Sequence, residues 1–251
     1  MQLKKNSEIV IIGGGIAGSS LAYHLAKLNK KDVTLLERHQ LTSGTTWHAA
    51  GLIMQLRSTH SLTEIAKYNV ELYSTLESET GVPTGFKQNG TLGVARTQDR
   101  MHETKIIGTI AKSFNIEAEM ISPSEAKDIY PSLNKECIEG AIYIPKDGQT
   151  NPVDTTMSLI AGAKKLGVSV HENIEVVDLK QNPDKSFTLI TKDEVVYCEK
   201  LIIACGLWTR NLAAKLGIKV PLYPAEHFYV VTDGTDDAKK NLPVLRDTDG
   251  H

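Results

Sequence analysis

The sequence predicts an α/β protein built on a Rossmann-like parallel sheet, and three consecutive features lead to that expectation. Residues 8–12 form a short, β-branched apolar run, as in a strand buried on both faces. A glycine-rich turn follows at once, and residues 16–28 repeat apolar side chains at helical spacing. Residues 33–36 then predict a second parallel strand, which ends on Glu37.

The three glycines of this turn have separate predicted roles. Gly13 allows the tight turn, Gly15 lets the backbone approach a pyrophosphate, and Gly18 lets the helix lie close to the strand. Ile16 and Ala17 begin the helix, whose first backbone N–H groups point toward the same phosphates. The turn therefore predicts a dinucleotide-binding site.

Glu37 narrows the choice of dinucleotide. A carboxylate at the end of the second strand, 19 residues after Gly18, is placed to accept hydrogen bonds from the hydroxyl groups of an adenosine ribose. It would repel a 2′-phosphate, which argues against NADP. The pattern does not separate FAD from NAD, so an NAD-dependent dehydrogenase is one alternative at this point.

Composition limits the class of protein. The 251 residues are 41% hydrophobic, which is enough for a core in one large or two modest domains. The net charge is −2 and basic residues are scattered, so neither nucleic acid nor a membrane is an expected partner. The three cysteines lie outside any CxxC pattern, which predicts reduced thiols, no disulfide framework and no metal site.

The middle of the chain interrupts the nucleotide-binding pattern. Apolar spacing predicts helices over residues 59–79 and 98–114, and residues 91–95 and 138–144 predict strands. The stretch Ser122-Pro123-Ser124-Glu125 is a capping box, which has a structural role.

The last third of the chain first returns to the nucleotide-binding pattern. Asn151 and Pro152 predict the start of a helix over residues 153–166, followed by a parallel strand over 168–170. A β-meander and one further strand are then predicted at residues 174–179, 186–191, 194–197 and 201–204.

These elements divide the chain into two expected domains. A dinucleotide-binding domain, with the parallel sheet and the β-meander, takes residues 1–85 and 146–216. An α+β substrate-side domain takes residues 86–145 and 217–251, and we expect it to be incomplete within this chain.

Residues 43–52, SGTTWHAAGL, carry the strongest chemical signal. They predict a small, hydroxyl-rich turn and a helix start, suited to close approach to a phosphate or a planar ring. The segment resembles the flavin-contacting segment of the dimethylglycine and sarcosine dehydrogenases, in which the matching histidine is bonded to the 8α-methyl group of FAD. The resemblance implies FAD held covalently through His48. A neutral imidazole is nucleophilic enough for that bond, although the residues alone favour a packed, hydrogen-bonded histidine.

The same family resemblance implies further cofactor contacts. The turn after residues 201–204 resembles the second FAD-contacting segment of the family, and the adenine-side contact falls at Val176 or the adjacent Val177. Besides the glycine turn, Glu37 and His48, the implied cofactor-binding residues are Arg38, Gly44, Thr45, Thr46, Gly51, Leu52, Val176, Gly206 and Trp208.

Residues 224–229 predict a strand in which His227 alternates with Phe228. The strand resembles the active-site strand of the family, where the matching histidine lies beside the substrate amine. The resemblance implies that His227 is catalytic and favours the unprotonated amine. The residues alone leave open an ordinary strand histidine with a structural hydrogen bond.

The resemblance implies oxidation of an N-methylated glycine, dimethylglycine or sarcosine, by hydride transfer from the N-methyl carbon to flavin N5. Implied partners are a small methylated amine, an electron-transferring flavoprotein or dioxygen, and folate bound by regions outside this chain. A non-catalytic regulatory or binding relative of the same fold is the alternative from a different class.

Location follows from the N-terminal residues. Residues 1–7 are basic but lack the apolar stretch of a secretory signal. We therefore expect a bacterial cytoplasmic protein, or a mitochondrial matrix protein if the chain is a processed eukaryotic form.

Overall fold

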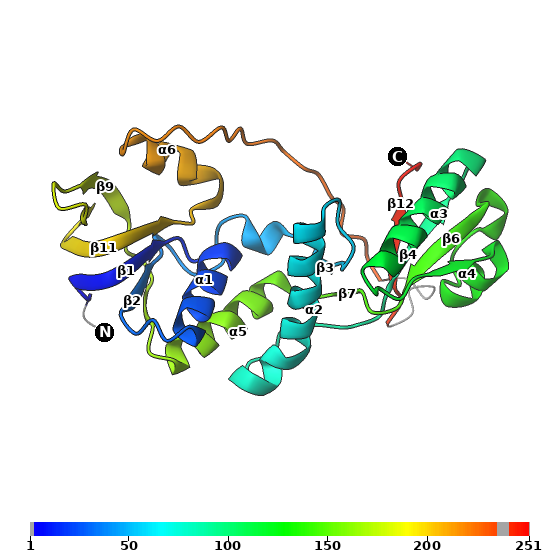
Figure 1. The fold of residues 1–251 in the computed structure, drawn as a ribbon, viewed down its shortest axis with the longest axis horizontal. Coiled ribbons are helices and arrows are strands. Elements are labelled where there is room, and N and C mark those ends of the chain that lie inside the picture. Colours follow the sequence, from blue (N-terminus) through cyan, green and yellow to red (C-terminus); the bar gives the residue numbers. More distant parts are fainter. Residues whose placement is uncertain (1–2, 235–240, 251) are drawn as a thin grey trace. The chain divides into compact units, whose positions relative to one another are not determined.

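The computed structural model describes residues 3–234 and 241–250, which form two compact units. Unit 1 comprises Met1–Ala50, Leu76–Thr84 and Pro152–Phe228, and unit 2 comprises Gly51–Thr75, Gly85–Asn151 and Tyr229–His251. Figure 1 labels their helices and strands. These boundaries differ from the predicted domains, mainly because residues 51–75 and 146–151 belong to unit 2 and residues 217–228 to unit 1.

Unit 1 is built on a six-stranded sheet with the order β8-β2-β1-β11-β10-β9. Its strands are β1 (Asn6–Ile12), β2 (Val33–Leu36), β8 (Ser169–His171), β9 (Val176–Gln181), β10 (Phe187–Thr191) and β11 (Val195–Ile203). The first four strands in this order are mutually parallel, whereas β10 pairs antiparallel with β11 and β9. The predicted parallel sheet with a β-meander is confirmed.

Strand β11 replaces two strands that the sequence predicted separately. Its first half pairs with β10 and its second half with β1, so that Tyr197 and Cys198 have partners on both sides. The polar residues between the two predicted strands, Glu199 and Lys200, are exposed. Lys200 lies opposite Ile9 in the parallel pairing of β11 with β1, so the strand continues through these charged residues. The Lys200 side chain also forms an ion pair with Glu8 of β1 at 2.8 Å.

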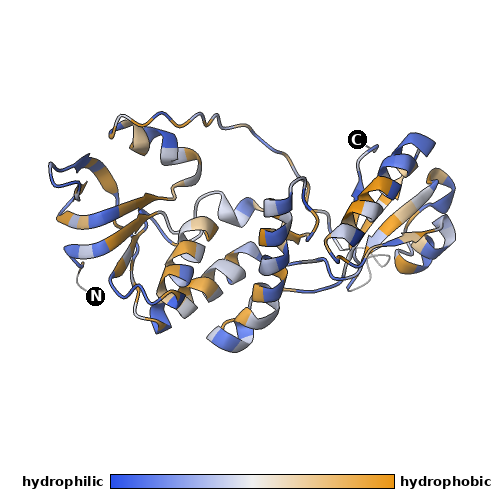
Figure 2. Cartoon of the chain, in the orientation of Figure 1, coloured by the Kyte–Doolittle hydropathy of each residue, from blue (hydrophilic) through white to orange (hydrophobic). Residues whose placement is uncertain are grey.

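Both faces of this sheet are covered. Helices α1 (Ile16–Lys27) and α5 (Pro152–Lys165) pack against each other, and α1 approaches Ile11 of β1. On the other face Val10 and Ile12 join a core with Leu179, Leu189 and Val196. A short helix, α6 (Thr209–Ala214), contributes Leu212 to that core. In Figure 2, β1 changes from hydrophilic at its start to hydrophobic where it enters this core.

Unit 2 contains a four-stranded sheet with the order β12-β4-β6-β5. Its elements are β4 (Thr91–Ala95), α3 (Gln98–Ser113), β5 (Glu119–Ile121), α4 (Pro123–Ile129), β6 (Gly140–Ile144) and β12 (Val244–Asp247). One cluster joins Ala111 of α3 to Ile142, and another joins Ala126 of α4 to Leu92, so the two helices cover opposite faces. The predicted capping box at the start of α4 is confirmed, because Ser122 and Glu125 exchange side-chain and backbone hydrogen bonds.

A buried carboxylate fixes the rest of unit 2. Asp147 is 1% exposed and accepts hydrogen bonds from Gln55 N at 2.9 Å and Thr91 Oγ1 at 2.7 Å. Burial raises the pKa of Asp147, which these hydrogen bonds oppose. The two hydrogen bonds to Asp147 join the loop before α2 (His60–Thr80) to the four-stranded sheet. A small antiparallel ribbon of β3 (Leu52–Ile53) and β7 (Gly148–Gln149) lies next to Asp147 in the sequence.

Residues 219–234 do not form the strand predicted at 224–229. No strand pairing involves them within the described part of the chain, and the side chains of residues 221–234 are exposed, as with Phe228 at 82%. The strand predicted at residues 224–229 was therefore wrong. No neighbouring strand among the described residues pairs with the backbone of this segment, and alternation of apolar residues alone does not make a strand.

Across residues 3–234 and 241–250, none of the helices has the length and apolar character needed to cross a membrane. Within the same ranges, His, Cys, Asp and Glu side chains form no group that could hold a metal ion.

Candidate functional site

The glycine turn after β1 leaves no room for side chains. Gly13 has a φ of +112°, and a Cβ atom there would lie 2.4 Å from the carbonyl oxygen of Ala204. A Cβ atom on Gly18 would lie 1.9 Å from the carbonyl oxygen of Gly13, so the predicted close packing of helix on strand is confirmed. Gly15 also lies close to another residue, because its Cβ atom would be 2.9 Å from Oγ1 of Thr46.

The start of α1 has backbone donors available. Gly14 N donates to Oε2 of Glu37 at 2.7 Å, and Ile16 N donates to Oγ1 of Thr46 at 3.0 Å. The N–H groups of Gly15 and Ala17 have no hydrogen-bond partner among the described residues. Such groups at a helix N-terminus are suited to bind an anion such as a diphosphate.

The carboxylate of Glu37 is already oriented by the backbone around it. Its Oε2 accepts from Gly14 N, and its Oε1 accepts from His39 N at 2.9 Å. Each carboxylate oxygen has a second lone pair, so both can still accept from ribose hydroxyl groups. Its place at the end of β2 is the one predicted from the sequence.

A turn between β8 and β9 holds the loop after Glu37 in place. Oε1 of Glu172 accepts from Leu41 N at 2.7 Å, and Asn173 N donates to the carbonyl of His39 at 2.9 Å. On the other side of the loop, Thr42 N donates to the carbonyl of Gly14 at 3.1 Å. These bonds set the position of the loop that carries Gly44, Thr45 and Thr46.

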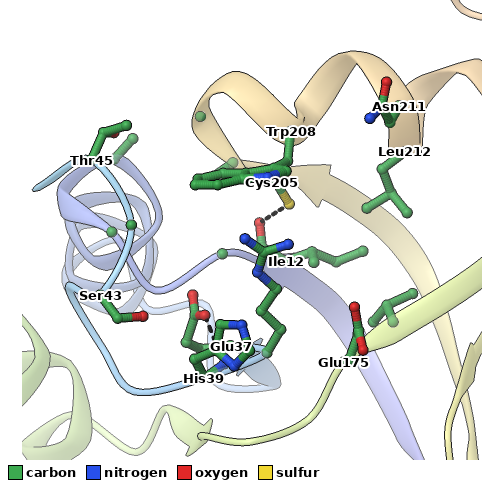
Figure 3. Close-up of a pocket in the computed structure, with 18 of the residues that line it drawn as sticks. Ile12, Glu37, His39, Ser43, Thr45, Glu175, Cys205, Trp208, Asn211 and Leu212 are labelled. Atoms are coloured by element: carbon green, nitrogen blue, oxygen red, sulfur yellow. Dashed lines mark hydrogen bonds between the residues drawn. The ribbon is translucent and has the colours of Figure 1, made fainter.

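These segments enclose a pocket of about 450 Å³ within unit 1. Figure 3 shows Glu37 and His39 across the pocket from Trp208 and Cys205. The predicted cofactor-binding residues that line it are Gly13, Gly15, Ile16, Ala17, Glu37, Arg38, Gly44, Thr45, Thr46, Val176, Gly206 and Trp208. The structure therefore brings together residues from four separate parts of the sequence.

Arg38 and Trp208 form one wall of the pocket. The guanidinium carbon of Arg38 lies 4.3 Å from the ring centre of Trp208, within cation–π range. Gly44 lies against the other end of the indole, since a Cβ atom on it would be 3.4 Å from the six-membered ring. A planar, apolar surface with an adjacent positive charge suits an aromatic base or a phosphate.

Cys205 lies in the same pocket, at the start of the turn that resembles the second FAD-contacting segment, although it was not among the implied cofactor-binding residues. Its Sγ donates to the carbonyl of Ile12 at 3.3 Å, and burial raises the pKa of its thiol to about 11. Lys215 also lines the pocket and pairs with Asp178 at 3.1 Å. The parallel pairing of β11 with β1 was the available signal, because carboxyl ends of parallel strands meet at one edge of a sheet.

Four predicted cofactor-binding residues lie outside the pocket lining. Gly18 packs the helix on the strand, as described above. His48 ends the short 3₁₀ helix Thr46–His48 and is exposed, with its ring stacked on Trp47. Gly51 and Leu52 belong to unit 2, where Leu52 pairs with Gln149 in the β3–β7 ribbon.

The predicted catalytic residue, His227, is not part of the pocket. It lies in the irregular segment 219–234 and is exposed.

The fold and site define a class of protein. Three features meet at the carboxyl edge of the parallel sheet: the glycine turn, the N–H groups without partners at the start of α1, and the carboxylate at the end of β2. Together they fit the adenosine diphosphate portion of a dinucleotide. The chain belongs to the DAO family, FAD dependent oxidoreductase, whose model matches residues 8–251. FAD is therefore the dinucleotide of the family, which answers the question that the glycine turn left open.

Curated relatives confirm the predicted resemblance. The chain is 40% identical over 240 residues to 4-methylaminobutanoate oxidase (formaldehyde-forming) of Paenarthrobacter nicotinovorans, with 96% of this chain and 29% of that protein covered. It is 40% identical over 250 residues to mitochondrial dimethylglycine dehydrogenase of Rattus norvegicus, with 98% and 29% covered. The chain thus spans about 29% of the length of these relatives.

Two other comparisons bear on the range of functions. The chain is 32% identical over 251 residues to the mitochondrial pyruvate dehydrogenase phosphatase regulatory subunit of Mus musculus, covering 99% of this chain and 29% of that protein. Among solved structures, L-proline dehydrogenase from P. horikoshii matches with a TM-score of 0.81 and 29% identity, over 86% of this chain and 57% of that one. The fold is thus shared by proteins named as enzymes and by one named as a regulatory subunit.

Proposed function

We propose that the protein containing this chain is an FAD-dependent oxidoreductase that oxidises a small N-methylated amino acid. The proposal is carried by the 40% identity, over nearly all of this chain, to two relatives named for N-methyl amine substrates. Dimethylglycine, sarcosine and 4-methylaminobutanoate are the candidate substrates, and all three carry an N-methylated amine and a carboxylate. The pocket of unit 1 supports the cofactor half of the proposal.

Each pocket residue has a proposed task toward the cofactor. Gly15 and Ala17 N–H groups bind the diphosphate, and Glu37 binds the ribose hydroxyl groups. Arg38 and Trp208 cover the nucleotide from one side. FAD supplies the two-electron redox chemistry when bound, and this chain supplies its position and surroundings.

His48 is the proposed point of covalent attachment of FAD. Three residues before it, Thr45 lines the pocket, and the His48 backbone N donates to the Thr45 carbonyl at 3.2 Å. Its ring makes no hydrogen bond or ion pair with any described residue. An imidazole without such a partner keeps the lone pair of its unprotonated nitrogen available for reaction.

His227 is the proposed group that favours the neutral substrate amine. A protonated amine has no lone pair, so it cannot lose a hydride to the cofactor in a favourable step. A neutral imidazole near the amine accepts its proton or a hydrogen bond from it. The proposal requires residues 219–234 to bring His227 to the substrate.

The electron acceptor, a further folate partner and the location also belong to this proposal. We propose an electron-transferring flavoprotein as acceptor, with dioxygen as the alternative, and folate as a partner of regions outside this chain. The relatives named above come from a bacterium and from mitochondria, and we propose the bacterial cytoplasm as the location.

Anaerobic substrate titration of the purified full-length protein that contains this chain tests the proposed reaction. We expect the visible flavin band to bleach with dimethylglycine, sarcosine or 4-methylaminobutanoate, and the order of rates to identify the substrate. Trimethylglycine is the matched control, because its quaternary nitrogen has no lone pair. A yellow protein that bleaches with dithionite but with none of the three amines would contradict the proposal.

The alternative is a non-catalytic regulatory or binding subunit, favoured by the relative named as a phosphatase regulatory subunit. It predicts a chain that is colourless, or yellow but unreactive toward every amine tested. The same titration therefore separates the two functions.

A further inference from the structure

The pocket of unit 1 has two ends, with Glu37 between them. In Figure 3, Thr45 lies at one end, and Glu175 and Asn211 lie at the other. The segment that carries Thr45 is hydrogen-bonded to the start of α1, so the first end belongs to the diphosphate. A nucleotide runs from phosphate through ribose to base, and Glu37 binds the ribose. The second end is therefore where the base lies.

Residues 174–177 form one wall of this base end. The wall adjoins the ribose site directly, because Ile174 N donates to the carbonyl of Glu37 at 2.8 Å. Val176 is 9% exposed and gives the wall an apolar surface. Glu175 lies between these two residues and is exposed, and its carboxylate has no hydrogen bond or ion pair with any residue that the structure describes. The acceptor oxygens of Glu175 are therefore available to a ligand in the pocket.

Helix α6 and its flanking residues form the opposite wall. Residues three, four and seven positions after Trp208 line the pocket with it, as expected for one helical face: Asn211, Leu212 and Lys215. Lys215 pairs with Asp178 of β9 at 3.1 Å, which links the two walls. The Asn211 side chain makes no hydrogen bond within the described ranges. Each wall of the base end thus presents a polar side chain without a partner in this part of the chain.

These two side chains differ in the bases that they can bind. A carboxylate only accepts hydrogen bonds, whereas an amide both donates and accepts them. Adenine has an amino group at position 6, which donates, while guanine and hypoxanthine have a carbonyl oxygen there, which accepts. Glu175 therefore favours adenine, and Asn211 can turn its amide to suit any of these bases. The cations Arg38 and Lys215 already contact an indole and a carboxylate, respectively.

We infer that Glu175 is a specificity-determining residue of the cofactor pocket, which accepts a hydrogen bond from the 6-amino group of adenine and disfavours a base with a 6-carbonyl group. Asn211 binds the same base from α6 without discriminating. Both side chains are exposed, so water competes for these hydrogen bonds, and the preference should be about tenfold, far below that of a fully buried polar site. This inference rests on the cofactor part of the proposed function and is independent of the amine substrate.

Nucleotide binding to the full-length protein that contains this chain, prepared without flavin under riboflavin limitation, tests the inference. Isothermal titration calorimetry measures the dissociation constants of ADP and of inosine diphosphate (IDP), whose base has a carbonyl group at position 6. The ratio of the two constants is the readout, because a change in folding or in diphosphate binding affects both nucleotides alike. Competition with FAD locates the binding in the pocket, and the melting temperature is recorded for every variant.

The wild type should bind ADP about tenfold more tightly than IDP. Glu175→Gln keeps the shape of the side chain but can donate to the carbonyl group of IDP, so the preference should fall to about threefold or less. Asn211→Ala should weaken the binding of both nucleotides by a similar factor and keep the wild-type ratio. Glu199→Gln changes an exposed carboxylate of β11 outside the pocket lining, and as the matched control it should bind both nucleotides like the wild type.

The possible failures are distinguishable. A Glu175→Gln variant that keeps the wild-type ratio, or a wild type that binds ADP and IDP equally, would overturn the role of Glu175 and leave FAD binding intact. A wild type with no ADP binding that FAD can displace would overturn the assignment of this pocket to the adenosine diphosphate portion, and the role of Glu175 with it. Failure of the proposed amine oxidation would appear only in the bleaching titration, which does not involve IDP or these variants.

Discussion

The glycine turn of unit 1 and the segment of residues 219–234 both showed local sequence patterns typical of regular structure, yet only the first forms it. Around the turn, backbone groups have partners from other elements: Gly13 N donates to Leu36 at 2.8 Å, and Gly14 N donates to Glu37. Along residues 219–234, Tyr223, Phe228 and Val230 are each more than four-fifths exposed.

The difference teaches what a local pattern specifies. The spacing of Gly13 and Gly18 encodes a local steric requirement, because a Cβ atom at Gly18 would overlap the carbonyl oxygen of Gly13. Alternation of apolar residues encodes only readiness to form a strand, which needs a neighbour to complete its hydrogen bonds.

The largest effect is expected from Gly18→Ala. The added methyl group forces the helix away from the strand, so the free energy of unfolding should fall by about 3 kcal/mol or more, the upper range for overpacked sites. FAD retention should fall with it. Urea denaturation and flavin content of the purified variant measure both.

Gly234→Ala is the matched control in the exposed segment. A Cβ atom there has nothing within 4 Å, so its unfolding free energy should stay within about 0.5 kcal/mol of the wild type. An equal fall in the free energy of unfolding of Gly18→Ala and Gly234→Ala would contradict the difference described between the glycine turn and residues 219–234.

His227→Asn tests whether the exposed segment has a catalytic task. Loss of a group that favours the neutral amine should lower kcat/KM by about 10²-fold at neutral pH and leave flavin retention unchanged. Phe228→Leu, at the adjacent exposed position, should behave as the wild type. A His227→Asn variant with wild-type kcat/KM at every pH would remove this residue from the mechanism.

A smaller contrast is expected among the cysteines. Burial raises the pKa of Cys205 to about 11, so at pH 8 its thiolate is roughly a hundredfold scarcer than that of a thiol with the ordinary value of 9.0. Iodoacetamide should therefore label exposed Cys137 first, and the rate at Cys205 should rise as pH increases toward 11. Peptide mass spectrometry of the flavin-free chain follows each site.

Bound FAD should slow labelling of Cys205 further, because this thiol lines the pocket. Cys198 has a similarly raised pKa but lies in the core of the sheet, so it serves as the control that FAD should not protect. Equal protection of the two cysteines would argue for general stiffening and against occupancy of the pocket.

The smallest effect is expected at Glu172. Glu172→Ala removes the hydrogen bond to Leu41 N, which is worth about 1 kcal/mol. The noncovalent affinity for FAD should therefore fall roughly fivefold. Glu172→Gln retains an acceptor oxygen and should recover most of the affinity. Fluorescence titration measures it, with Glu199→Ala, an exposed carboxylate on β11, as the control. Identical affinities in all three variants would show that the β8–β9 turn does not position the loop.

Much of the fold was accessible from sequence because its signals are local. The buried run before Gly13, the carboxylate at Glu37 and the capping box at Ser122 each depend on residues a few positions apart. The site was less accessible, since Cys205 and Lys215 line the pocket from a distant part of the chain. Glu172 likewise supports the loop after Glu37 from a turn far away in the sequence. The short pair β3 and β7 and the strand β12 have too few residues for a periodic signal, so they too were missed.

The central claim is that the loop after Glu37 places His48 at the flavin end of a cofactor bound over the glycine turn. Acid precipitation of the purified full chain, followed by peptide mapping of any retained flavin, tests it most directly. We predict that the yellow colour stays with the protein and that the peptide containing His48 carries the added mass of FAD. Flavin found free in the supernatant, or attached to a different residue, would contradict the account.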